Sequence, residues 1–258
     1  MGSRTAYEPG TFSRVELFTT DPRDAKRFYG QLLGWQTDDA SETATRGGKA
    51  VAAITEQPDG QRSAGVPPNW LSYVTVASAD DSAARADELG GEVHAGPFDA
   101  RDAGRVAIVA DPTGAMLGLW EPRGSIGAEL VNDPGCLTSN ELATDDVEAA
   151  SSFYRGLFGW SIKQVDTGGG PGYWLIQHDG AAEGRNGGMR ELTLREGGVP
   201  PNWVPYFSAP SIDDTLARTG ELGGSTLVAA TEIPAGRFAA VRDPQGAAFA
   251  IFEGEVDD

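Results

Sequence analysis

The sequence predicts an α+β protein built from two copies of one small domain. Three observations lead to this prediction: a long internal repeat, a weaker repeat within each copy, and alternating apolar patterns typical of half-buried strands. The order strand, helix, strand, strand, strand occurs four times. Four such βαβββ modules imply curved mixed sheets with the helices outside, and each pair of modules would enclose a cleft. With 258 residues, the chain is long enough for two domains that each bury a core.

The internal repeat covers nearly the whole chain. The segment 12–35 returns as 137–160, with a carboxylate, a Phe-Tyr pair and a Gly-Trp pair at matching places. The motif PPNW occurs at 67–70 and again at 200–203, and an Asp-Pro pair occurs at 111–112 and at 243–244. The second copy has a longer Gly-rich stretch between 166 and 198, which reads as a loop. We expect a first domain over 10–124 and a second over 134–256.

Each module opens with a strand and then a helix. In the first module we expect a strand over 13–19 and a helix over 22–33, with Asp21 as N-cap and Pro22 at the first helical position. The second module follows PPNW, and its helix ends where glycines follow Leu89. Its expected elements are a strand over 71–77, a helix over 80–89, and strands near 92–95, 105–110 and 115–120.

Charge and composition exclude several classes of partner. The net charge of −18 argues against nucleic acid, because phosphate binding needs a positive patch. No apolar run is long enough to cross a membrane, and the polar N-terminus lacks the apolar core of a signal peptide. The single cysteine, Cys136, excludes an internal disulfide and a CxxC metal site. We therefore expect a cytoplasmic protein, either a monomer or a homodimer.

A family resemblance follows from the module motifs. A strand followed by DPRDAKRFYGQLLGW resembles the opening of a vicinal oxygen chelate module, and DPTGAMLGLWEP and DPQGAAFAIFEG resemble its closing hairpin. The superfamily includes glyoxalases, bleomycin-resistance proteins and extradiol dioxygenases, and the tandem arrangement is similar to an actinobacterial branch. The resemblance implies tandem glyoxalase-like domains. It does not imply one reaction, because this fold carries several chemistries and also non-catalytic drug binders.

The resemblance also implies where a divalent metal would bind. Most enzymes of the superfamily hold the ion with His, Gln and Glu side chains that point into the cleft. In this chain the corresponding positions carry residues that bind metals poorly: Arg14, Leu71 and Gly118 in the first copy, and Ser139, Val204 and Ala250 in the second. The chain has only two histidines, at positions that do not match in the repeat. We therefore expect no metal and no other cofactor.

Two equivalent glutamates are the candidate catalytic residues. Strand alternation places Glu16 and Glu141 on the face that would line each cleft. A carboxylate on a half-buried strand is costly unless it is paired or hydrogen-bonded. Each glutamate is thus a general base, a residual metal ligand or a structural strut. As struts, Glu16 would pair with Arg14 or Arg105, and Glu141 with Arg237.

Aromatic and small side chains on the same faces suggest a place for a flat ligand. Ordinary core packing is the alternative explanation. The second copy is the better candidate for a specific site because it has the longer loop, which would act as a lid. The candidate ligand-binding residues are Arg14, Phe18, Tyr73, Arg105, Trp120, Trp174, Met189, Trp203, Tyr206, Arg237 and Phe252.

Three functions remain open. The favoured hypothesis is a metal-free protein that binds a small apolar or aromatic molecule, such as an antibiotic or a toxic metabolite, and that acts on it if Glu16 or Glu141 serves as base. The second is a metal-dependent lyase or dioxygenase of glyoxalase type. The third is an interaction or signalling protein whose clefts are filled.

Overall fold

The fold of the first half matches the expected element order closely. The computed structural model describes residues 2–167, 172–178, 185–192 and 198–255. Most boundaries lie within two residues of the expected ones, and the strand expected at 92–95 continues to Ala100. The elements of this half are β1 (Gly2–Ser3), β2 (Phe12–Thr19), α1 (Pro22–Leu33), β3 (Thr43–Arg46), β4 (Lys49–Glu56), α2 (Asp59–Ser63), β5 (Asn69–Thr75), α3 (Ala79–Glu88), β6 (Glu92–Ala100), β7 (Gly104–Ala110), β8 (Met116–Pro122) and β9 (Leu130–Val131).

The second half follows the same order of modules, and the connection 178–184 is longer than its counterpart 47–48. Parts of the Gly-rich stretch that would form the expected lid, 168–171, 179–184 and 193–197, lie outside the described residues. The elements of this half are β10 (Leu137–Thr144), α4 (Val147–Phe158), β11 (Ser161–Val165), β12 (Tyr173–Gln177), β13 (Arg185–Glu191), β14 (Asn202–Ser208), α5 (Ile212–Glu221), β15 (Ser225–Ile233), β16 (Gly236–Arg242) and β17 (Ala248–Gly254).

The first helix of each half begins and ends through the same local chemistry. Asp21 caps α1 by accepting a hydrogen bond from the Asp24 amide, and Asp146 caps α4 in the same way. Each helix ends at a glycine in the left-handed conformation, Gly34 at φ 73° and Gly159 at φ 70°. A residue with a Cβ would be strained at these two positions.

Each half of the chain forms its own mixed sheet. The seven-stranded sheet has the order β3-β4-β2-β5-β8-β7-β6, and the eight-stranded sheet has the order β11-β12-β13-β10-β14-β17-β16-β15. The two modules of a half meet through an antiparallel pair, β2 with β5 in the first sheet and β10 with β14 in the second. The outer face of each sheet is therefore built by one half alone.

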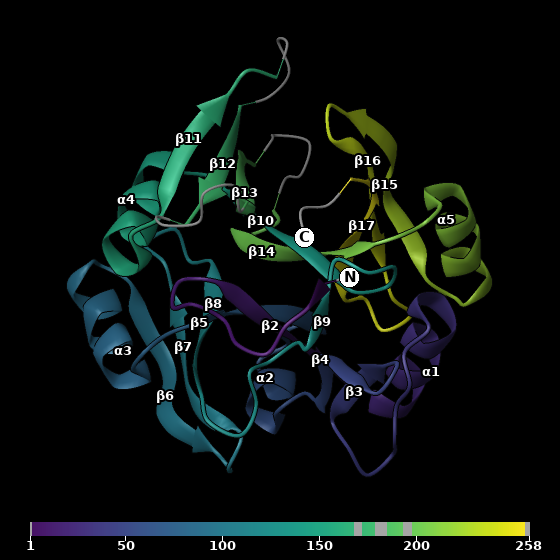
Figure 1. Cartoon of the computed structure of the whole chain (residues 1–258), viewed down its shortest axis with the longest axis horizontal. Helices are drawn as coiled ribbons and strands as arrows, with labels where there is room; N and C mark the ends of the chain where they lie inside the picture. Colours follow the sequence, from purple (N-terminus) through teal and green to yellow (C-terminus); the bar gives the residue numbers. More distant parts are fainter. Residues whose placement is uncertain (1, 168–171, 179–184, 193–197, 256–258) are drawn as a thin grey trace.

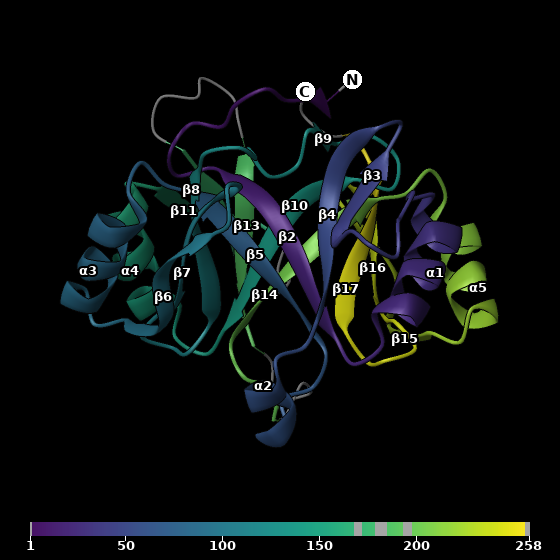
Figure 2. The same ribbon diagram turned by 90° about the horizontal axis from the view of Figure 1, so that it is seen from below.

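The two sheets lie back to back, with the helix pairs α1/α5 and α3/α4 at the sides (Figures 1 and 2). Both large apolar clusters contain residues of both halves. One joins Val15, Leu17 and Tyr29 to Phe207 and Phe249, all fully or almost fully buried. The apolar face of each sheet thus packs against the other half, which leaves the opposite faces turned outward.

Buried polar groups lock this interface at two equivalent places. The Tyr29 hydroxyl donates to Asp243 Oδ2 at 3.0 Å and accepts from Trp70 Nε1 at 3.1 Å. In the other half, the Tyr154 hydroxyl accepts from Trp203 Nε1 at 2.8 Å, and the Asp111 carboxylate is the charged group that acts on this hydroxyl. Because burial raises the pKa of both tyrosines well above 10, each hydroxyl keeps its proton and remains a donor.

Candidate functional site

The outer face of the first sheet carries a carboxylate that is fully engaged by its own domain. Glu16 lies on β2, and its two oxygens accept hydrogen bonds from Thr55 at 2.7 Å, from Tyr73 at 2.8 Å and from Arg14 at 3.2 Å. Its side chain keeps only 12 % of its exposure. Of the expected struts, Arg14 is the partner of Glu16 and Arg105 is not.

Arg14 occupies the space where a flat ligand was expected in the first domain. Its guanidinium carbon lies 5.6 Å from the centroid of the Tyr73 ring and 5.1 Å from that of Trp120. These distances are typical of cation–π contacts. Tyr73 is 2 % and Trp120 1 % exposed. The chain therefore covers its own aromatic residues on this face.

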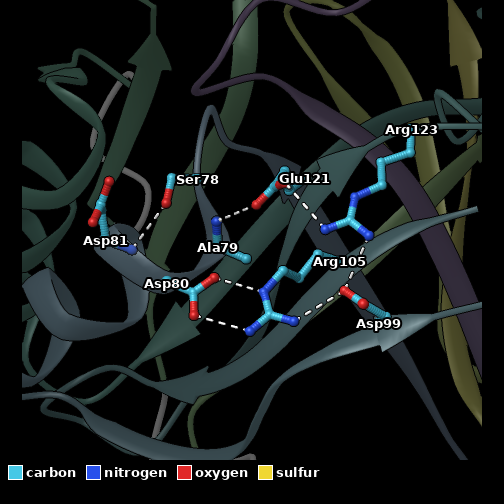
Figure 3. A network of polar contacts seen from close by, with 8 residues as sticks. All are labelled: Ser78, Ala79, Asp80, Asp81, Asp99, Arg105, Glu121 and Arg123. Carbon is cyan, nitrogen blue, oxygen red and sulfur yellow. Dashed lines mark hydrogen bonds and ion pairs between the residues drawn. The ribbon is translucent and has the colours of Figure 1, made fainter.

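The segment after β8 closes the same face. Trp120 Nε1 donates to the Ser125 carbonyl at 3.1 Å, and the Ala128 amide donates to the Ser13 carbonyl at 2.7 Å. The start of the segment is held by ion pairs, since Asp99 bridges Arg123 and Arg105 (Figure 3). Residues 123–128, at the end of the expected first domain and just after it, therefore form a strap over the first sheet.

Arg105 and Arg237 form ion pairs at the surface and do not contact Glu16 or Glu141. Arg105 binds Asp80 and Asp99 (Figure 3), and Arg237 binds Asp213 and Glu253. Glu121 and Glu253 hold the starts of α3 and α5, because they accept from the backbone amides of Ala79 and Ile212 respectively. The expectation that Glu141 pairs with Arg237 is wrong.

The outer face of the second sheet carries a different set of partners around Glu141. Arg190 Nε donates to Glu141 Oε1 at 3.0 Å, and the hydroxyls of Tyr206 and Tyr173 also hydrogen-bond to this carboxylate. Burial is the largest influence and raises the pKa of Glu141, although Arg190 and the tyrosines act in the opposite direction. The side chain of Glu141 keeps 12 % of its exposure, the same fraction as that of Glu16.

Several exchanges distinguish the two faces, among them Thr55 for Arg190 and Arg14 for Ser139. Ser139 stands on β10 opposite Tyr206, as Arg14 stands on β2 opposite Tyr73. A serine is too short to cover the neighbouring rings. Accordingly Tyr206, Phe238 and Phe252 are half-buried, whereas Tyr73 and Trp120 on the first sheet are buried. The rings of Tyr206 and Phe238 lie 6.2 Å apart.

Three candidate residues point away from the outer face. Met189 and Trp203 are 0 % and 4 % exposed and belong to the core between the halves, and Trp174 packs against that core. Trp203 does not face a ligand, because its indole donates to Tyr154 in that core. Phe18, in contrast, packs with the outer-face cluster of the first sheet. The sequence reasoning missed Arg190, which lies on β13, the counterpart of β4.

The side chains at the expected metal positions do not fit a divalent ion. Among the described residues, no group of three His, Cys, Asp or Glu side chains could hold a metal. Glu16 and Glu141 each lie against an arginine, which would repel a cation. His94 and His178 are elsewhere, near Glu92 and the Pro9 carbonyl respectively.

Within the described residues, no helix is long and apolar enough to cross a membrane.

Comparisons with known proteins agree with this architecture. The family model described as "Glyoxalase/Bleomycin resistance protein/Dioxygenase superfamily" matches residues 11–119 and 137–251. The chain is 38% identical over 262 residues to "Putative glyoxylase CFP32" of Mycobacterium tuberculosis, covering 98% of both chains. It is 33% identical over 269 residues to "Anthracycline biosynthesis protein DauV" of a Streptomyces species, covering 96% of this chain and 95% of the relative.

Solved structures share the fold at low sequence identity. The Mn(II)-bound glyoxalase from Novosphingobium aromaticivorans superposes with a TM-score of 0.65 at 14% identity, covering 100% of this chain and 85% of the other. The 2,3-dioxygenase LapB from Pseudomonas superposes with a TM-score of 0.62 at 11% identity, covering 96% and 93%. The chain belongs to the glyoxalase/bleomycin resistance protein/dioxygenase superfamily and contains two copies of its domain.

Proposed function

We propose that this protein binds a flat, largely apolar small molecule on the outer face of its second sheet. The observation that carries the proposal is the exchange of Arg14 for Ser139. In the first domain the arginine lies over the aromatic rings and the strap closes the face. In the second domain the equivalent rings are half-buried around a short serine. The binding site would thus lie in the second domain, and the first would be structural.

The chemistry of the second face suits an aromatic ligand. Tyr206 lies beside the small residue Ala250, and Phe238 pairs with Phe252 on the neighbouring strands. Rings of a flat molecule can stack on such side chains at an offset and remove apolar surface from water, at about 25 cal/mol per Å² buried. The one polar group at the centre, the Glu141 cluster, would orient the ligand.

The relatives support a natural product or antibiotic as the molecule. Two relatives from Streptomyces are named anthracycline biosynthesis proteins, DauV and DnrV, and the family model includes bleomycin resistance proteins. Sequestration of such a compound in the cytoplasm, by a monomer or a homodimer, is the concrete form of the proposal. The poor metal donors on both faces support binding without a metal.

The test is equilibrium dialysis with 2-methoxynaphthalene, a neutral flat probe. We expect one saturable site per chain. Ser139→Arg rebuilds the first-domain arrangement and should weaken binding at least tenfold, because the guanidinium would cover Tyr206 as Arg14 covers Tyr73. Ser63→Arg adds the same charge at an exposed position on α2 and should change nothing. Absence of saturable binding, or equal binding by Ser139→Arg, would contradict the proposal.

A second candidate function is catalysis on the bound molecule, with Glu141 as general base. The raised pKa of Glu141 favours it, because a base works best when its pKa lies near the operating pH. Glu16, held by Arg14, is the weaker candidate. Mass analysis of a bound natural product before and after incubation tests this function. Turnover that survives Glu141→Gln would argue against it.

A further inference from the structure

We propose that two copies of this chain form a dimer by antiparallel pairing of β15 with β15 of the second copy. The interface is separate from the ligand site proposed above and does not depend on it. β15 is the last strand of the second sheet, so one side of its backbone faces no other strand of the described residues (Figure 1). Backbone N–H and C=O groups along a long edge strand are a template for a further strand.

The side chains of β15 expose more apolar surface than an edge strand in water usually does. Eight of its nine residues are exposed. Leu227 and Val228 are each 42 % exposed, and Ile233 is 39 % exposed. Of the six large hydrophobic side chains that are exposed among the described residues, three lie on this strand. A row of apolar side chains on a free edge indicates a surface that another chain covers.

The counterpart edge in the first sheet is protected, and β15 is not. β6 holds the same place in its module, and both strands have register shifts against their neighbours. β6 carries Pro97 in its interior and the charged residues Glu92 and Asp99. Proline removes a backbone donor, and charges on an edge oppose association. β15 has no proline and no basic residue, and its single charged residue is Glu232, near its end.

Charge complementarity favours a second copy of the chain as the partner. Consider the antiparallel pair whose two-fold axis passes between Val228 and Ala229. Glu232 then lies opposite Ser225 of the second copy. Because Ser225 pairs with Arg242 on β16, Glu232 shares a face with Arg242 of the second copy. The two residues are two strands apart, about 10 Å, which long glutamate and arginine side chains can span. Both are exposed, and Arg242 forms no ion pair within the described part of the chain.

The two-fold symmetry makes this arrangement self-complementary. Each Glu232–Arg242 contact occurs twice, once on either side of the axis. The same register places Leu227 and Val228 of both copies near the centre, so apolar surface is buried there and charges lie at the rim. The net charge of −18 makes two copies repel each other over most of their surface. A long strand with one charged residue is a place where they can approach.

The first experiment measures the association of the full chain by sedimentation velocity at increasing protein concentration. We expect a reversible dimer with a dissociation constant of roughly micromolar order, because one strand pair buries a small area. Val228→Lys places like charges near the axis and should weaken the dimer about tenfold or more. Phe98→Lys is the matched control, because Phe98 is 47 % exposed on β6, and it should leave the dimer unchanged.

The second experiment tests the register by exchanging the charges. Glu232→Arg alone or Arg242→Glu alone should weaken the dimer about tenfold, because each like-charge contact occurs twice. The double variant restores opposite charges and should return the dissociation constant to within about threefold of wild type. All these positions are exposed, so the variants should fold, and circular dichroism checks this.

The outcomes are clear in both directions. A dimer that Val228→Lys disrupts, Phe98→Lys leaves intact and the double charge exchange restores would support the proposal. A wild-type chain that stays monomeric at the highest concentration would overturn it. A dimer that Val228→Lys leaves intact would overturn it as well, because the contact would then lie elsewhere. Single charge reversals without effect, or a double variant as weak as the single ones, would refute the pairing described.

Discussion

Replacing Tyr29 by phenylalanine tests the lock between the two halves. The substitution removes only the hydroxyl, so packing of the ring in the core is kept. It leaves two buried groups without a partner, the Trp70 indole N–H at 3.1 Å and the Asp243 Oδ2 at 3.0 Å. Neither group has a route to water, because Trp70 is 6 % and Asp243 3 % exposed.

The expected loss follows from these two contacts. A buried neutral donor without a partner costs about 1–3 kcal/mol, and an unpaired charged acceptor costs more. The other oxygen of Asp243 keeps the amides of Gln245, Gly246 and Ala247, which moderates the effect. We expect the free energy of unfolding to fall by about 2–5 kcal/mol, and Tm to fall by about 2–4 °C for each kcal/mol in a chain of this size.

The assay is urea unfolding followed by tryptophan fluorescence, with differential scanning calorimetry for Tm. Tyr154→Phe removes the acceptor of the Trp203 indole N–H and should cost less, about 1–3 kcal/mol. Tyr7→Phe is the control, since its hydroxyl makes one contact, to the Ala128 carbonyl at 2.6 Å. A loss below about 1 kcal/mol for Tyr29→Phe would refute the assignment of these groups as buried and dependent on the tyrosine.

Three further predictions concern the outer faces. The pKa of Glu141 is raised in the fold, so the folded chain holds the proton of this side chain more tightly than the unfolded chain does. The contribution of Glu141 to stability therefore falls as pH rises above about 4.3. In urea titrations, Glu141→Gln should gain stability relative to wild type from pH 4 to pH 8, and a constant difference would contradict this. Gly118→Ala should cost about 1–3 kcal/mol, because the new Cβ would lie 2.0 Å from the Tyr73 ring; equal Tm values would contradict it. Chelator treatment should leave Tm unchanged, and elemental analysis should find no stoichiometric divalent ion, since the aligned positions lack donors.

Local chemistry made the elements predictable. Asp21 before Pro22 and the glycines after each helix are capping signals that act within a few residues, so they identify α1 and its repeat directly. The repeat then gave the module order, and strand alternation gave the outward face of Glu16 and Glu141. Trp35 and Trp160, the tryptophans of the repeated Gly-Trp pairs, are core residues that are 4 % and 2 % exposed.

Partners across the sheet were not predictable in the same way. Arg190 reaches Glu141 only because β13 pairs in parallel with β10, and no spacing in the sequence shows this register. Trp203 looked like a candidate for the ligand face because it follows Pro-Pro-Asn, and Met189 because it belongs to the second copy only. The structure places them on the inner face, where the other half covers them.

The sequence by itself determined the repeat, the module order, the family and the poor metal donors, because each depends on residue identity and short spacing. Only the tertiary structure decided that the halves pack back to back and that one outer face is closed by Arg14 and the strap while the other is more open. These features depend on which strands pair and on which side chain reaches over which ring. Such contacts join residues far apart in the chain, and their free energies appear only when the whole fold is assembled.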